Sequence, residues 1–164
     1  MKMTLDELKD GVECPCCGQD CVLRKEHVDY AKAYALIELW NMARNGDWVH
    51  VDDIRIFKGK TAATLGGRFA SLRYWGLIEE KYNEDTRKRC SGFWKITQFG
   101  CDFVLKKARV PKTWRVFDMT QFYSEGEMVD IRQCLGKHFD YEEVLDLYRG
   151  GDSEYYDDRQ QPLF

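Results

Sequence analysis

The fold class of this chain follows from residues 61–82, which read TAATLGGRFASLRYWGLIEEKY. Thr61 is a suitable N-cap for a helix that runs to Tyr74. The side of this helix that faces the core is a narrow stripe made of Leu65, Phe69, Leu72 and Gly76. Leu77-Ile78 then begins a strand that extends to Tyr82.

Elements on either side of this segment complete an ordered set. In chain order we expect a helix from Asp29, a strand at 48–51, a brief helix capped by Asp52, the helix at 61–74, strands at 77–82 and 93–97, and a helix that Thr97 caps and Pro111 ends. This is the order of a winged helix-turn-helix domain. We therefore predict an α+β chain with such a domain at residues 29–111, in which residues 83–92 form the wing.

The formal net charge of −3 conceals an uneven distribution. Residues 55–115 contain 15 Lys and Arg against 5 Asp and Glu, whereas residues 1–54 contain 6 against 11 and residues 116–164 contain 4 against 12. Clustered positive side chains displace counterions from phosphates. The basic centre therefore favours a polyanionic partner, and a solvated basic face without a partner is the alternative.

In a helix-turn-helix domain the second helix enters the major groove of DNA. The predicted nucleic-acid-binding residues are Lys58, Lys60, Thr64, Arg68, Ser71, Arg73, Arg87, Lys88 and Arg89, the last three at the tip of the wing. We expect Ser71 and Tyr74 to face outward with Thr64, and the cations to share one surface. Small residues such as Ala63 and Gly67 occupy the rest of the exposed face, whereas base discrimination usually needs Arg, Asn, Gln or Lys.

Four of the seven cysteines lie within residues 14–21. Cys14-Pro15-Cys16-Cys17-Gly18 contains the C-P-x-C-G knuckle, in which two thiolates bind zinc from a tight turn closed by glycine. Cys14 and Cys17 are the expected pair. The other two ligands are sought in Cys21 and His27, or in the distant pair Cys134 and His138. We expect a structural zinc in the segment 1–28, and reduced cysteines in a degenerate knuckle are the alternative.

Residues 112–149 are predicted to be a small α/β extension of the domain. A hairpin is expected at 114–123, and Asp130 and Asp140 each precede a short helical pattern. Residues 150–164 are acidic and rich in Gly, Asp and Tyr, and they are expected to be disordered.

The chain ends Gln160-Gln161-Pro162-Leu163-Phe164. This sequence resembles the short peptide by which bacterial DNA-processing proteins dock on the replicative sliding clamp. Gln160 matches the leading Gln of that peptide, and Leu163 and Phe164 match its two apolar anchors. Such a peptide orders on binding; the alternative is a terminus whose Leu-Phe folds back on the domain.

The combined pattern resembles a group of small proteins from bacteriophages and prophages. The residues that carry the resemblance are Cys14-Pro15-Cys16-Cys17-Gly18, Leu72 to Glu79, Gly92 to Thr97, Gly100, Phe103, Val110-Pro111 and Phe139-Asp140-Tyr141. The resemblance implies a winged helix and a zinc knuckle, with no known activity. Cys21 and Cys134 are not part of the shared pattern.

Two functions compete on these observations. The first is a DNA-binding regulator or accessory factor of phage type that binds double-stranded DNA, as a monomer or a homodimer. The second is a protein-interaction adaptor that acts on host machinery and is tethered to the clamp by its tail. We do not expect an enzyme, because His27, His50 and His138 lie far apart in sequence and have no nucleophile or carboxylate pair around them. The sequence contains no secretory signal or membrane-spanning run, so we expect a cytoplasmic protein without membrane contact.

Overall fold

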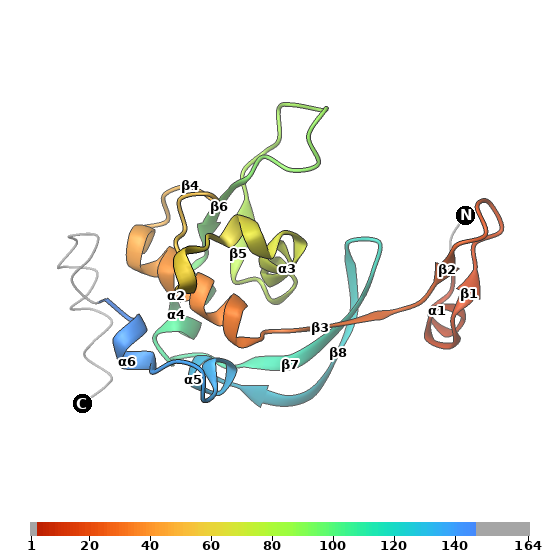
Figure 1. Cartoon of the computed structure of the whole chain (residues 1–164). Coiled ribbons are helices and arrows are strands. Elements are labelled where there is room, and N and C mark those ends of the chain that lie inside the picture. Colours follow the sequence, from red (N-terminus) through yellow and green to blue (C-terminus); the bar gives the residue numbers. More distant parts are fainter. Residues whose placement is uncertain (1–2, 147–164) are drawn as a thin grey trace.

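The computed structural model describes residues 3–146 of the chain. Within that range the chain is a mixed α and β structure with six α-helices, short 3-10 helices and three small antiparallel sheets (Figure 1). The prediction of a mixed α and β fold is confirmed at this level.

The N-terminal unit is small and lies at one end of the molecule (Figure 1). Helix α1 (Leu5–Asp10) begins at Thr4, whose hydroxyl accepts from the Glu7 amide while the Glu7 carboxylate accepts from the Thr4 amide. Strands β1 (Val12–Glu13) and β2 (Asp20–Cys21) form a two-stranded hairpin. A separate small core joins this unit to the hairpin of residues 110–129. Leu8, Cys21 and Leu23 are buried in this core, and Phe117 and Tyr123 of the hairpin pack against them.

The second sheet has the strand order β3-β7-β8. It consists of β3 (Arg24–His27), β7 (Val110–Phe117) and β8 (Thr120–Val129). Strand β3 pairs with β7, so that Arg24 lies opposite Val116 and His27 lies opposite Thr113. Strands β7 and β8 pair from Val110 with Val129 to Phe117 with Thr120. The predicted hairpin at 114–123 is thus confirmed, and it is longer than expected at both ends.

Helix α2 (Tyr30–Ala43) runs through the main core. Asp29 caps it by accepting from the Lys32 amide. The four apolar residues at helical spacing are buried: Ala33, Leu36, Ile37 and Trp40. At its end, the buried Asn41 side chain donates to the Val144 carbonyl and accepts from the Asp146 amide, which ties the last described turn to the helix.

The third sheet has the order β4-β6-β5, with the last strand in sequence at its centre. It consists of β4 (Val49–His50), β5 (Ile78–Glu80) and β6 (Phe93–Ile96). Helix α4 (Gln98–Val104) follows, and the Thr97 hydroxyl caps it by accepting from the Gly100 amide. These three strands and the cap agree with the predicted elements.

Two predicted helices differ from the structure. The brief helix after Asp52 is absent. Ile54 and Ile56 lie instead in an extended segment, where both side chains point into the core. Only a 3-10 turn, η1 (Phe57–Gly59), follows. The helix at 61–74 is divided into η2 (Ala62–Leu65), α3 (Gly67–Ala70) and η3 (Ser71–Trp75). The break occurs at Gly66, whose φ of 55° and ψ of −130° lie outside helical backbone.

The end of the described chain packs on α2 rather than forming a separate unit. Helix α5 (Ile131–Leu135) begins at Asp130 with a capping box to Gln133, and α6 (Tyr141–Val144) begins at Asp140. Ile131, Leu135, Tyr141 and Val144 belong to the same core as α2. Strand β7 also crosses the predicted boundary at 111/112, so residues 29–111 and 112–146 share one core.

Candidate nucleic-acid interface

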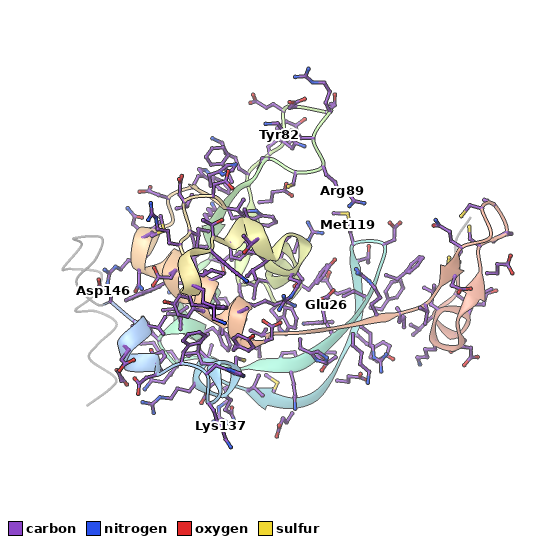
Figure 2. All side chains as sticks on the ribbon, viewed as in Figure 1. Glu26, Tyr82, Arg89, Met119, Lys137 and Asp146 are labelled. Carbon is purple, nitrogen blue, oxygen red and sulfur yellow. The ribbon has the colours of Figure 1, made fainter. Side chains whose placement is uncertain are left out.

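A groove of about 680 Å³ lies where the divided helical segment, the base of the wing and the β7–β8 hairpin meet. Its lining comes from residues that are far apart in sequence. The charged residues among them are Arg24, Glu26, Arg68, Arg73, Glu80 and Arg89. Figure 2 shows Arg89, Met119 and Glu26 following one another down this side of the molecule.

The floor of the groove is built from small residues around the break at Gly66. Ala62, Ala63, Gly66, Gly67 and Ala70 all line it. A side chain added at Gly66 or Gly67 would meet no other atom within 4 Å, so the space above these residues is open. The segment expected to be a protruding helix therefore forms a concave surface.

Three of the four arginines are oriented by carboxylates. Arg68 donates to Asp29, the residue that caps α2. Arg73 lies 3.9 Å from Glu80, measured from Nη1 to Oε2, and Arg24 lies 3.9 Å from Glu26, measured from Nη2 to Oε1. The lining thus holds four positive and two negative side chains, an excess of positive charge.

Asp29 shows how one of these contacts is balanced. Partial burial raises the pKa of its carboxyl, but the Lys32 amide and the Arg68 guanidinium together lower it by more, so that the pKa lies below its usual value. The carboxylate is therefore ionised at neutral pH, where it both caps α2 and holds Arg68.

The loop of residues 81–92, which contains the segment predicted to be a wing (83–92), joins β5 to β6. Asp85 accepts from both the amide and the Nε of Arg87, at 3.1 Å each, and these contacts lower the pKa of the Asp85 carboxyl. The Asn83 side chain donates to the Lys88 carbonyl at 2.8 Å. Arg87 nevertheless leaves 89% of its side chain exposed. The wing tip is thus an ordered turn that presents cations to solvent.

The predicted nucleic-acid-binding residues fall into three groups. The first group, Arg68, Arg73 and Arg89, lines the groove. The second group is exposed to solvent but lies outside the lining of the groove: Lys58, Lys60, Thr64, Arg87 and Lys88.

Ser71 is the third group. It lines the groove, as does Tyr74, which we also expected to face outward, but neither side chain has the predicted exposure. Both are buried, 3% and 6% exposed, and the Ser71 hydroxyl donates to the Arg68 carbonyl at 2.6 Å. The change from α to 3-10 geometry after Ala70 alters the angular positions that a continuous helix would give.

Among the groove residues that the sequence reasoning missed are Arg24 and Met119. Arg24 is carried by β3, whose sequence Arg-Lys-Glu-His has no apolar alternation to mark it as a strand. Met119 lies at the turn of the hairpin, in a Phe-Asp-Met-Thr sequence without the usual Asn-Gly signal. From the sequence alone, only the positive charge of Arg24 could have indicated that either residue belongs to a polyanion-binding surface.

The predicted cysteine knuckle, residues 14–18, is a tight turn that closes at Gly18. The Gly18 amide donates to the Cys14 carbonyl at 2.8 Å, and Gly18 has a φ of 73°. Hydrogen bonds from the Cys16 and Cys17 amides lower the pKa of the Cys14 thiol. Burial, and then the nearby Cys14, raise the pKa of Cys21, which packs beside it. The environment thus favours the thiolate, the form that binds soft metals, at Cys14 and the neutral thiol at Cys21.

His27 is not brought to these cysteines. Its Nδ1 lies 3.0 Å from the Thr113 hydroxyl, in the β3–β7 pair. Among residues 3–146, no three His, Cys, Asp or Glu side chains are arranged as a complete ligand set. His138 stacks on Tyr30, and burial raises the pKa of Cys134 to about 12.

The predicted clamp-binding residues Gln160, Leu163 and Phe164 lie outside the described residues. No helix in the described part of the chain is long and apolar enough to cross a bilayer.

No protein-family model, no curated protein and no solved structure matches this chain.

Proposed function

We propose that this chain is a DNA-binding protein that uses residues 29–111 as a winged helix. Support for the fold comes from the element order α2, β4, the divided helical segment, β5 and β6, and from the sheet order β4-β6-β5. The long loop between β5 and β6 is then the wing. In this proposal the protein serves as a regulator or accessory factor of phage type on double-stranded DNA.

One observation carries the proposal: three arginines predicted from the sequence line one groove although they come from two separate elements. Arg68 and Arg73 belong to the divided helical segment, and Arg89 belongs to the wing. Arg24 adds a fourth guanidinium from β3. Guanidinium groups bind phosphate oxygens in a bidentate manner, so a row of them suits a sugar-phosphate backbone.

The small floor of the groove bears on the kind of recognition. Side chains that discriminate bases are long and polar, whereas Ala63, Gly67 and Ala70 are not. Such a floor allows the backbone of a strand to approach closely without reading base edges. We therefore propose binding that depends mainly on phosphates and on the shape of the duplex.

Salt dependence tests the proposal quantitatively. Each phosphate neutralised on B-DNA adds about 0.9 to the slope of log affinity against log salt concentration. With a fluorescein-labelled duplex and anisotropy between about 50 and 200 mM salt, Arg89→Gln should make this negative slope shallower by about 0.9. The triple variant Arg87→Gln/Lys88→Gln/Arg89→Gln should make it shallower by up to about 2.7.

The matched control is Lys137→Gln, because Figure 2 places Lys137 on the side of the molecule away from the wing. Its slope should equal that of the unaltered protein. Negligible affinity for the duplex at low salt, or equal slopes for the triple variant and the control, would refute DNA binding through this surface.

Zinc is part of the proposal as a structural element. Cys14 and Cys17 would supply two thiolates from the turn, and Cys21, whose thiol interacts with both, would supply a third. A zinc ion there would staple a unit whose own core contains only a few buried side chains.

A further inference from the structure

The tip of the β7–β8 hairpin has an unusual composition for its backbone. The two strands are joined by Asp118 and Met119, with φ angles of 47° and 60°. Two successive positive φ values define the tight primed turn, where Asn-Gly is the usual pair because side chains resist this region. The hairpin instead places a long apolar side chain at a position that disfavours it.

The Met119 side chain is not there to fill a core. It is 58% exposed, the most exposed of the methionines among the described large hydrophobic residues. It lines the same groove as Arg89 and Arg24. Figure 2 shows it rising from the hairpin tip toward Arg89. An exposed apolar side chain thus stands beside a row of cations.

We propose that Met119 is a wedge that inserts between base steps of the DNA held along the groove arginines, so that binding unstacks and bends the duplex. This inference rests on the proposed DNA binding and adds the mode of contact. Proteins that bend DNA insert apolar side chains, Met among them, from the minor-groove side while arginines and lysines hold the adjacent phosphates. A two-stranded ribbon is narrow enough to bring one side chain to a groove of the duplex.

The charges around the tip explain why the occupant is a nucleic acid rather than an apolar peptide. Four arginines line the groove beside Met119, against Glu26 and Glu80. An apolar segment would desolvate the four guanidinium groups and offer no acceptor for the excess of positive charge over the two carboxylates of the lining, which is costly. A duplex offers both parts at once, with phosphates for the guanidinium groups and apolar base faces for the thioether.

The β7–β8 hairpin is held rigidly by contacts within and beside it, as insertion of a side chain between bases requires. Arg115 on β7 donates to Glu125 on β8 at 2.6 Å, and Val116 is fully buried. Strand β3 pairs along the other edge of β7 from Arg24 to His27. The tip therefore projects from a three-stranded sheet rather than from an isolated ribbon.

The experiment uses the full chain and a duplex of about 20 base pairs, labelled at both ends for energy transfer and carrying 2-aminopurine at successive central steps. Binding of the unaltered protein should raise 2-aminopurine fluorescence at one step and shorten the end-to-end distance. Met119→Ala should remove both signals and weaken binding about tenfold, while Met119→Leu should retain them. Met128→Ala is the control, since Met128 is also exposed on β8 but does not line the groove.

A second variant separates insertion from folding of the turn. Asp118→Asn/Met119→Gly suits the primed turn better, so it should keep or raise the thermal stability while losing the fluorescence signal. If the unaltered protein binds in a salt-sensitive manner but neither unstacks nor bends the duplex, the wedge is refuted and DNA binding stands. Signals unchanged in Met119→Ala would refute the wedge equally. Absence of salt-sensitive binding by the unaltered protein would instead refute the proposed function itself.

Discussion

Replacing Gly100 with Ala tests how closely helix α4 packs against Leu77, the residue before β5. Gly100 lies in the first turn of α4 and is buried against the strand end at Leu77. The Leu77 carbonyl accepts from the Thr97 amide, and the Thr97 hydroxyl donates to the Gly76 carbonyl. A methyl group at Gly100 would lie 2.1 Å from that Leu77 carbonyl oxygen and 2.7 Å from Cγ1 of Ile96.

The magnitude follows from two opposing effects. Overpacking of a filled site costs about 1–3 kcal/mol, and the upper end applies because the obstacle is backbone. Replacement of Gly by Ala inside a helix returns about 1 kcal/mol. The net loss in the free energy of unfolding is therefore about 2 kcal/mol, which lowers Tm by roughly 4–8 °C in a chain of this size.

Thermal unfolding followed by circular dichroism measures this loss. Gly67→Ala is the matched control, because Gly67 also lies in a helix but a methyl group there meets no neighbouring atom. Its Tm should stay within about 2 °C or rise slightly. A Gly100→Ala protein that melts at the unaltered temperature would show that α4 does not pack against Leu77 as described.

Three further predictions concern the metal, the tail and the cap of α2. Metal analysis of the purified protein should find about one zinc per chain, lost in Cys14→Ser/Cys17→Ser and kept in Cys90→Ser; equal metal content in both variants would end the zinc proposal. Deletion of residues 163–164 should abolish capture of a bacterial sliding clamp without changing Tm, and undiminished capture would dispose of that tether. The folded state lowers the pKa of the Asp29 carboxyl. Its stabilising contribution is therefore present above the unfolded pKa of about 3.9 and is lost as pH falls through the folded pKa. The Tm of the unaltered protein should exceed that of Asp29→Asn at neutral pH, and this difference should shrink below about pH 4; a difference that stays constant with pH would contradict the described contacts.

The elements predicted best from sequence are those whose signals are local. Asp29, Thr97 and Asp130 each cap a helix through the amide three residues ahead. Such a contact depends on four consecutive residues and little else. The capping residues therefore located these helix starts correctly without any knowledge of the tertiary structure.

Continuity of a helix is a less local property. Of the predicted core stripe, Phe69 and Leu72 are buried, but Leu65 is half-buried and Gly76 is exposed. The stripe could not show that Gly66 would break the helix, because apolar spacing says nothing about the dihedral angles between the stripe residues. The outward orientations predicted for Ser71 and Tyr74 failed for the same reason.

The groove was the part least accessible to sequence reasoning. Arg24 and Met119 reach it through the pairing of β3 with β7, two strands separated by more than 80 residues. Of the predicted nucleic-acid-binding cations, Arg68, Arg73 and Arg89 line the groove, whereas Arg87 and Lys88 from the same loop as Arg89 do not. The concavity itself arises from long-range packing, for which the local sequence contains no periodic signal.

The carboxylates of the groove determine how its arginines could serve a polyanion. The Arg73–Glu80 contact is long, at 3.9 Å, and about a quarter of each side chain is exposed, so the guanidinium is open to phosphate oxygens on its exposed side. Glu80 thus orients Arg73 before binding and does not block it. Arg68 differs, because its partner Asp29 also caps α2 and keeps that guanidinium attached to the fold. Arg89 on the exposed wing has the fewest constraints, and the salt dependence of binding is therefore expected to come from the wing rather than from the helical segment.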